Sequence, residues 1–102
     1  MRYRIEYSRL AVSHLRALTA GEQRTIVDAV ERSLGAEPIV ETRHRKRMRP
    51  NPIAPWELRV GDFRVYYDVE EREESEDAFI EVLAIGRKQR NRLFIGGKEI
   101  GL

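Results

Sequence analysis

Two arginines, Arg59 and Arg64, flank a Gly-Asp pair within the segment Trp56–Val69. Apolar and polar residues alternate on both sides of Gly61-Asp62, which predicts a β-hairpin with glycine at the first central position of a type II′ turn. Pairing outward from this turn places Arg59 opposite Arg64. Like charges at such positions are mildly destabilising, whereas two neighbouring guanidinium groups bind a phosphate or carboxylate well. The pattern indicates an anion-binding face, and the alternative is that both arginines are simply solvated.

The other face of the same hairpin is predicted to be apolar. Its expected cross-strand pairs are Val60 with Phe63, Leu58 with Val65, and Trp56 with Tyr67. Glu57 falls opposite Tyr66, on the face that carries the arginines. The hairpin is therefore expected to join the core through one face and to present a polar, cationic face on the other.

Positive charge is concentrated in two further segments. Arg43–Arg49 has five Lys or Arg residues in seven positions, and Arg87–Arg92 has four in six. The formal net charge is only +2 because Glu70–Asp77 holds six acidic residues and one arginine. Basic clusters suit a nucleic-acid backbone or an acidic protein partner. We expect Arg43–Arg49 to be a partner-binding loop and Arg87–Arg92 to project beside the hairpin.

Periodicity predicts the elements that position these residues. Residues 2–7 alternate and read as a strand with Tyr3, Ile5 and Tyr7 inward. Ser8 is placed to cap a helix with apolar residues at Leu10, Ala11, Leu15 and Leu18. Thr19–Glu22 has the form of a capping box that opens a second helix, with an apolar stripe at Ile26, Val27, Val30 and Leu34 and an end at Gly35 and Pro38. His14 lies on the stripe of the first helix and reads as a histidine at the edge of the core.

The rest of the chain alternates between loops and strands. Residues 40–55 are charged and contain three prolines, so we expect a basic connecting loop. The acidic run 70–77 is expected to be a solvated turn. Residues 79–85 are almost continuously apolar and predict a central strand that ends at Gly86. The glycine-containing tail 93–102 is expected to be short, extended or frayed.

Composition excludes several kinds of site. The 102 residues suffice for a single domain, 1–102, with one modest core. There are no cysteines and only two histidines, so neither disulfides nor a metal site are expected, and no cofactor is implied. The start of the chain lacks the apolar stretch of a signal peptide, and no long apolar run is present. We therefore expect a cytoplasmic protein without membrane association.

The order strand, helix, helix, strand, strand, strand resembles the RelE/ParE superfamily of bacterial toxins from type II toxin–antitoxin modules. The resemblance rests on Arg-x-Gly-x-Phe-Arg-Val-x-Tyr across the turn and Ile-Gly-Arg-Lys-x-Arg after residue 84, and it runs from Tyr3 to about Phe94. It implies an α+β fold with an N-terminal strand and an αα-hairpin packed on a small antiparallel sheet of about four strands.

The resemblance implies two different activities. The RelE branch implies a ribosome-dependent ribonuclease that cuts mRNA, and the ParE branch implies a DNA gyrase inhibitor that is not an enzyme. Both imply a cognate antitoxin as partner. A third reading is a catalytically decayed member that only binds its antitoxin. We expect translation to be inhibited by mRNA cleavage on the ribosome, and the two alternatives stay open.

Residues are carried over from the family by position. Its phosphate-binding arginine corresponds to Arg64, its lysines before the hairpin to Pro55 and Glu57, its later arginine to Lys88 or Arg87, and its tyrosine to Phe94. Metal-free RNA cleavage needs a base, an acid and cations. We expect these catalytic roles to fall to Arg64, Lys88, Glu57 and Tyr66, with His44 as another possible proton carrier. The expected phosphate- and RNA-binding residues are Arg59, Arg87, Arg90, Arg92, Arg45, Lys46, Arg47 and Phe94.

Overall fold

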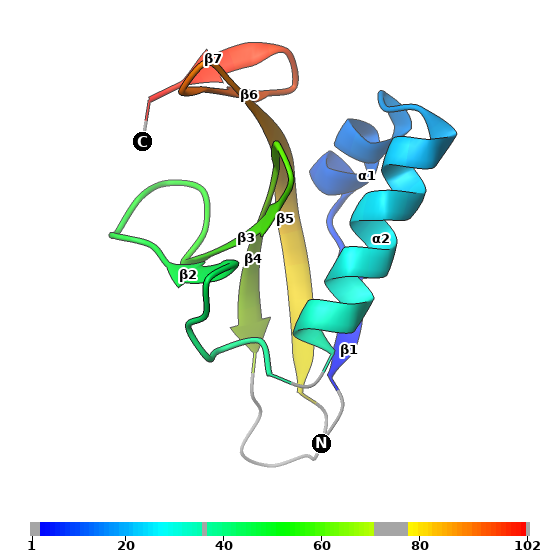
Figure 1. The fold of residues 1–102 in the computed structure, drawn as a ribbon. Helices are drawn as coiled ribbons and strands as arrows, with labels where there is room; N and C mark the ends of the chain where they lie inside the picture. The colour runs from blue at the N-terminus through cyan, green and yellow to red at the C-terminus, as the bar shows by residue number, and fades with distance from the viewer. Residues whose placement is uncertain (1–2, 36, 71–77, 102) are drawn as a thin grey trace.

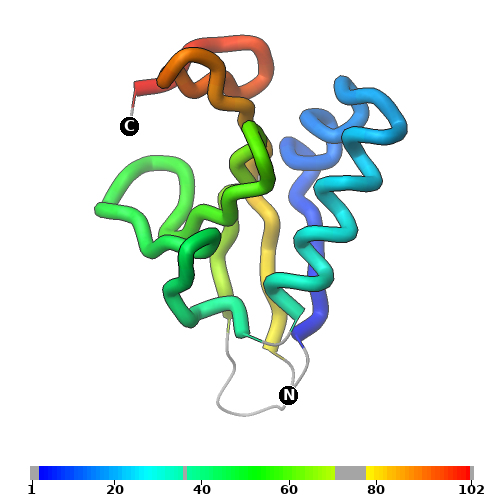
Figure 2. The backbone as a smooth tube through the Cα atoms, in the orientation of Figure 1, coloured from blue at the N-terminus to red at the C-terminus, as the bar shows by residue number. Residues whose placement is uncertain are grey.

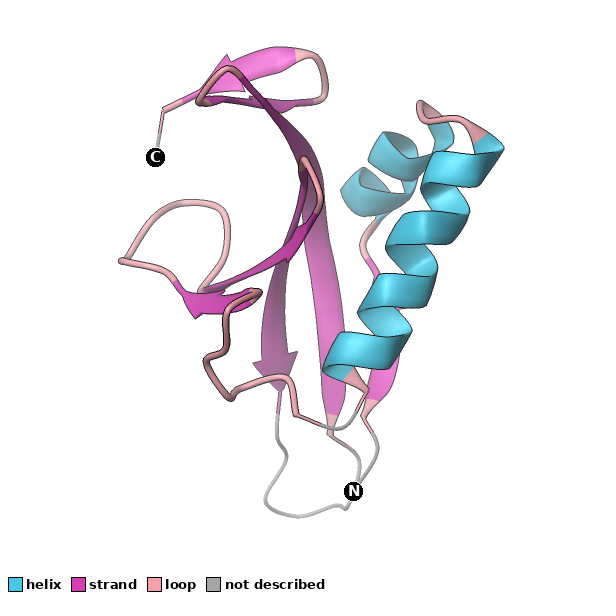
Figure 3. Ribbon diagram, viewed as in Figure 1, coloured by secondary structure: helices cyan, strands magenta, loops and turns pink. Residues whose placement is uncertain are grey.

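Two helices cover one face of a mixed β-sheet in the computed structural model, which describes residues 3–35, 37–70 and 78–101 (Figures 1 and 3). The elements are, in chain order, β1 Arg4–Tyr7, α1 Arg9–Arg16, α2 Ala20–Leu34, β2 Arg45–Arg47, β3 Trp56–Val60, β4 Phe63–Glu70, β5 Phe79–Gln89, β6 Arg92–Ile95 and β7 Lys98–Ile100. The sheet runs β2-β3-β4-β5-β6-β7, and β1 pairs with β5. The expected α+β class is confirmed.

The β3–β4 hairpin has the expected register. All five predicted pairs are present, including Arg59 with Arg64 and Glu57 with Tyr66. Gly61 has φ +57°, and Asp62 is not among the described residues with positive φ, as a type II′ turn requires. Alternation and a two-residue turn were sufficient to specify this register.

Strand β5 is central, as expected, but it is longer than residues 79–85. It continues through Gly86 to Gln89 and pairs with β4 along one edge. Its other edge pairs with β1 in parallel and then with β6. The expectation that Gly86 ends the strand is wrong. Glycine is needed there because a Cβ at this position would lie 2.9 Å from the Phe94 carbonyl oxygen and 2.9 Å from Ile95 Cγ1.

Three short strands extend the sheet beyond the four expected. Residues 45–47 of the expected basic loop form β2, which pairs antiparallel with β3. The tail forms a hairpin of β6 and β7 around Gly96-Gly97, both with positive φ. The acidic run was expected to be a turn, but its residues 71–77 lie outside the described part of the chain, and Glu70 belongs to β4.

The two helices begin where the sequence predicts. The Ser8 hydroxyl accepts a hydrogen bond from the Ala11 N–H, and Thr19 and Glu22 form the complete capping box of α2. Gly35 caps the end of α2. Leu10 was expected on the buried stripe of α1, but it is 58 % exposed. Neither helix in the described part of the chain has the length and apolar character needed to span a membrane.

Side chains are buried on both faces of the sheet. The main core lies between the helices and the sheet and includes Ile26, Val30, Leu34, Trp56, Leu58, Val65, Tyr67 and Ile80. A smaller cluster on the opposite face consists of Ala54, Tyr66, Ala84 and Leu93. The β2–β3 loop lies on the side of the sheet away from the helices (Figure 2). This loop and the β6–β7 hairpin supply the residues that border the polar face of the β3–β4 hairpin.

Candidate functional site: a cationic groove

A groove of about 790 Å³ lies on the face of the sheet opposite the helices. Its walls are the loop 48–51 and parts of the β6–β7 hairpin, and we call it the cationic groove. Six basic side chains and two acidic ones line it: Lys46, Arg47, Arg49, Arg59, Lys88, Arg92, Glu57 and Glu99. Arg59 pairs with Glu57 and Arg92 pairs with Glu99. The other four cations have no carboxylate within 4 Å among the described residues, so the groove attracts anions.

Glu57 and Tyr66 form the floor of the cationic groove. Cross-strand pairing aligns Lys46, Glu57 and Tyr66 in one row across β2, β3 and β4. Glu57 is 8 % exposed, and its Oε1 lies 3.3 Å from Arg59 Nε. A buried carboxylate at the base of a cationic surface is costly unless charge or hydrogen bonding compensates it. Glu57 therefore provides a proton acceptor close to any anion bound in the groove.

The Tyr66 side chain is fully buried beside this carboxylate. Its hydroxyl has no hydrogen-bond partner among the described residues. Burial, and next the negative charge of Glu57, raise the pKa of Tyr66. Tyr66 therefore keeps its proton at neutral pH, and its hydroxyl is a buried hydrogen-bond donor on the strand that pairs with Glu57.

The facing arginines do not converge on one point. Arg59 turns toward Glu57, whereas Arg64 Nη1 donates to the carbonyl oxygens of Gly61 and Phe63 at 2.8 and 2.9 Å. Arg64 thus braces its own turn and is not among the residues that line the groove. Paired guanidinium groups avoid like-charge repulsion when each finds a separate acceptor, which explains how both are accommodated.

One asparagine shapes the loop wall of the groove. Asn51 Oδ1 accepts from the N–H groups of Ile53 and Ala54, and its Nδ2 donates to the carbonyl oxygens of Arg49 and Ala54. The Met48 N–H also donates to the Pro55 carbonyl oxygen at 2.8 Å. Side-chain bonds of this kind fix an irregular loop in one conformation. The backbone of the loop 48–55 is thereby held in place beside the groove.

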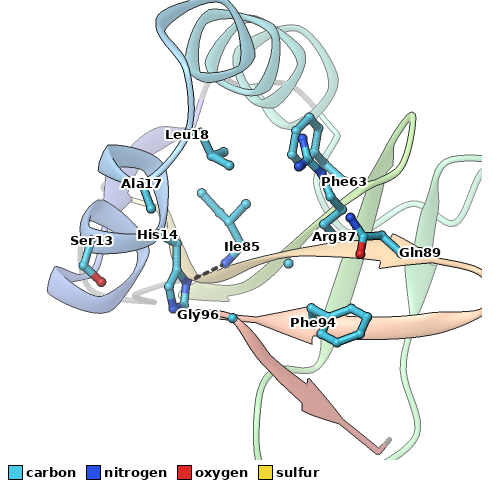
Figure 4. Close-up of a pocket in the computed structure, with 12 residues that line it drawn as sticks. Ser13, His14, Ala17, Leu18, Phe63, Ile85, Arg87, Gln89, Phe94 and Gly96 are labelled. Atoms are coloured by element: carbon cyan, nitrogen blue, oxygen red, sulfur yellow. Dashed lines mark hydrogen bonds between the residues drawn. The ribbon is translucent and has the colours of Figure 1, made fainter.

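A second groove of about 510 Å³ lies on the helix side of the sheet, between α1 and the β6–β7 turn (Figure 4). We call it the helix-side groove. Arg87 stacks over the Phe63 ring at 4.5 Å and pairs with Glu22. The hydrogen bond from the Thr19 N–H, and then that from Arg87, lower the pKa of Glu22. This carboxylate belongs to the capping box as well, so it ties the start of α2 to β5.

His14 forms the opposite wall of the helix-side groove (Figure 4). Its Nδ1 accepts a hydrogen bond from the Ile85 N–H at 3.1 Å. Burial lowers the pKa of His14 from its ordinary value of 6.5. The ring is therefore neutral at pH 7, with its proton on Nε2, and the expected edge-of-core position is confirmed.

Protonation of His14 should destabilise the fold in acid. Its pKa is lower in the folded than in the unfolded chain, so the unfolded chain takes up the proton first as the pH falls below about 6.5. The stability from His14 is complete above that pH and is lost toward the lower, folded pKa. We expect the thermal midpoint to fall from pH 7 to pH 5. His14→Gln retains an acceptor for Ile85 and does not titrate, so a fall of equal size in that variant would exclude His14 as the cause.

No family model and no curated protein sequence matches the chain. Solved structures do. A chain of the toxin-antitoxin complex RelBE2 from Mycobacterium tuberculosis superposes with a TM-score of 0.70 at 19 % identity, over 86 % of this chain and 100 % of that one. A chain of the archaeal RelE-RelB complex from Pyrococcus horikoshii OT3 superposes with a TM-score of 0.65 at 23 % identity, over 88 % and 99 %. The chain has a RelE-like fold. At these identities the likeness establishes the architecture, and activity has to be argued from the site.

The RelE-like fold brings seven of the twelve residues expected from the sequence into the cationic groove. These are Glu57, Tyr66, Lys88, Arg59, Arg92, Lys46 and Arg47. Arg64 braces the hairpin turn, and Arg90 is exposed at the β5–β6 turn with φ +52°. Arg45 donates to the carbonyl oxygens of Ser33 and Val40 and pairs with Glu37. Its contacts anchor β2 to the end of α2.

Arg87 and Phe94 line the helix-side groove and not the cationic one. Because β5 continues through Gly86, Arg87 and Lys88 point to opposite faces of the sheet. The sequence interpretation missed Arg49, Asn91 and Glu99 as lining residues of the cationic groove. Arg49 was visible within the first basic cluster, whereas Asn91 and Glu99 are placed there only by the fold of the tail. The described residues hold no group of three or more His, Asp or Glu side chains that could bind a metal.

Proposed function

We propose that this protein is the toxin of a toxin–antitoxin module and that it cleaves mRNA bound in the cationic groove. The observation that carries the proposal is Glu57, a buried carboxylate on the floor of a groove whose lining includes four cations with no carboxylate within 4 Å in the described part of the chain. Two chains from toxin–antitoxin complexes share the fold, which supports the toxin role and an antitoxin partner. The ribosome would present the mRNA.

The groove residues have the types that metal-free cleavage requires. The Glu57 carboxylate takes the proton from a ribose 2′-hydroxyl, and the 2′-oxygen then attacks the adjacent phosphorus. Lys88 donates a proton to the departing 5′-oxygen as its bond to phosphorus breaks. The products are a 2′,3′-cyclic phosphate and a free 5′-hydroxyl, so no water, metal or oxidant is consumed. Arg59 and Lys46 stabilise the additional negative charge in the transition state.

Arg59 and Tyr66 have different effects on Glu57. Arg59 lies on its solvent side and leaves toward a phosphate when RNA binds, which frees the carboxylate to accept a proton. Tyr66 pairs with Glu57 across β3 and β4, and its protonated hydroxyl donates a hydrogen bond to the carboxylate once Arg59 has left. Tyr66 is thus a positioning residue in this mechanism.

Mapping of RNA ends in cells tests the proposal. The protein is expressed from a tightly repressed promoter, and 5′ ends of cellular mRNA are mapped within minutes of induction, alongside Lys88→Ala. Arg32→Ala, which removes an exposed arginine of α2 away from the groove, serves as the control. New ends at consistent codon positions are expected in the wild type and in Arg32→Ala, and their number should fall at least tenfold in Lys88→Ala.

Other outcomes would overturn the cleavage proposal. Growth arrest without new mRNA ends would indicate a non-enzymatic target, with DNA gyrase as the first to assay by supercoiling. An absence of arrest would favour a decayed protein that only binds an antitoxin. Equal cleavage by Lys88→Ala and the wild type would place the chemistry outside the cationic groove.

A further inference from the structure

The helix-side groove differs from the cationic groove in its charge. Among the described residues that line it, Arg87 is the only permanently charged one, and Arg87 is paired with Glu22. His14 is neutral, since burial lowers its pKa and its Nδ1 accepts from the Ile85 N–H. A phosphate would find no free cation in this part of the described chain. The groove therefore suits an uncharged ligand.

The groove also offers flat surfaces and hydrogen-bonding groups. Phe63 and the Arg87 guanidinium are already stacked, and the Phe94 ring lies across the groove from α1 (Figure 4). His14 Nε2 carries a proton, and Gln89 supplies both an amide donor and an acceptor. Leu18 and Ile85 form apolar wall and floor. Aromatic rings and guanidinium planes beside a few neutral donors and acceptors are the surroundings in which unpaired nucleobases bind.

The two grooves lie back to back on one β-ribbon. Lys88 lines the cationic groove, whereas its neighbours Arg87 and Gln89 line the helix-side groove. Asn91 and Arg92 line the cationic groove up to the end of the ribbon, where Arg90 is exposed in the turn. A single strand that leaves the cationic groove can follow these residues around the turn, with its phosphate beside Arg90, and reach the helix-side groove with its next bases.

We propose that the helix-side groove is a nucleobase subsite for the RNA strand whose backbone occupies the cationic groove. This inference rests on the proposed RNA binding and extends it, because the subsite reads a base several positions from the scissile phosphate. Phe94 stacks on the base, and His14 and Gln89 hydrogen-bond its edge. Sequence preference at that position is the functional consequence.

The test uses the purified full chain and a nine-nucleotide single strand of 2′-O-methyl RNA, which lacks the attacking hydroxyl. The fluorescent base 2-aminopurine is placed at each position in turn, and its quenching by stacking is measured on binding. We expect strong quenching at one position of the strand, outside the part bound in the cationic groove. Phe94→Leu should abolish that quenching and weaken binding of the nine-mer about tenfold, whereas Phe94→Tyr should keep both.

A trinucleotide of the same chemistry separates the two proposals. Phe94→Leu should bind it as the wild type does, and Lys88→Ala should bind both lengths more weakly. Equal weakening of both lengths by Phe94→Leu, or quenching at no position, would overturn the nucleobase subsite while RNA binding stands. Failure of the wild type to bind either strand would overturn the nucleobase subsite, whereas the cleavage proposal stands or falls with the mRNA ends mapped in cells. Normal RNA binding by Phe94→Leu with loss of capture of a partner peptide would assign the groove to a protein instead.

Discussion

Replacing Glu57 by glutamine should lower the rate of mRNA cleavage by a factor of about 10²–10⁴, which is the usual contribution of a positioned general base. The amide has nearly the size of the carboxylate but cannot accept the 2′-hydroxyl proton. RNA binding should persist or become tighter, because the change removes a negative charge from a cationic groove. The rate is measured under single-turnover conditions with programmed ribosomes, and binding is measured separately.

A second carboxylate in the groove provides the matched control for this substitution. Glu99 also lines the cationic groove and pairs with an arginine, but its side chain is 53 % exposed, whereas that of Glu57 is 10 % exposed. Glu99→Gln should change the cleavage rate by less than about threefold, because an exposed ion pair contributes little. If Glu57→Gln cleaves as fast as Glu99→Gln, another group removes the proton, and His44 is then the first to replace.

Gly86→Val should remove both grooves together and destabilise the fold by about 3 kcal/mol, at the upper end for overpacking a buried site. A Cβ at position 86 would lie within 3.0 Å of Leu93 Cδ1 and closer still to the Phe94 carbonyl oxygen. Strand β6 would have to separate from β5 to relieve these contacts. Because Leu93 lines one groove and Phe94 the other, both walls would move.

The measurements for Gly86→Val are denaturant unfolding and binding of single-stranded RNA. Gly21→Ala is the control, since nothing lies within 4 Å of a Cβ there and the residue is in the first turn of α2. That substitution should stabilise the protein by up to about 1 kcal/mol through helix propensity. Unfolding of Gly86→Val at the wild-type denaturant midpoint would show that β6 does not pack against β5 as described.

How much of the site was predictable depends on the range of the interactions involved. The five pairs of the β3–β4 hairpin follow from alternation around Gly61-Asp62, which is local information. The caps at Ser8 and Thr19 are also local. These features placed Glu57, Arg59 and Tyr66 on one face before any tertiary contact was known.

The errors in the predicted site follow from how Gly86 was interpreted. Gly86 reads locally as a strand end, so Arg87 and Lys88 were assigned to one basic cluster. In fact glycine is required because β6 approaches closely, and the strand continues. A continuing strand sends neighbouring side chains to opposite faces. The different locations of Lys88, Arg87 and Phe94 could therefore not be inferred without the long-range pairing of the tail.

Burial of Tyr66 illustrates the same limit for a single side chain. Its strand position was predicted correctly, and it was expected beside Arg64 on a polar face. The loop 48–55 and the β6–β7 hairpin supply apolar neighbours, among them Met48, Ile53 and Ile100, that cover this part of the sheet. The sequence around Tyr66 does not show that distant segments will cover it. A residue expected at the surface is therefore part of a second, smaller core.

The parallel pairing of β1 with β5 has a consequence for how fast the chain folds. Arg4 pairs with Phe79 and Tyr7 with Val82, so the sheet closes between residues from opposite parts of the chain. Loop closure over such separations costs entropy before the contacts that repay it can form, and topologies of this kind fold slowly compared with helical proteins of the same size. During synthesis on a ribosome, β1 and the helices have no β5 to pack on until residue 82 has emerged. The polypeptide therefore completes its central strand late in synthesis, and both grooves form only after the β6–β7 hairpin has followed it.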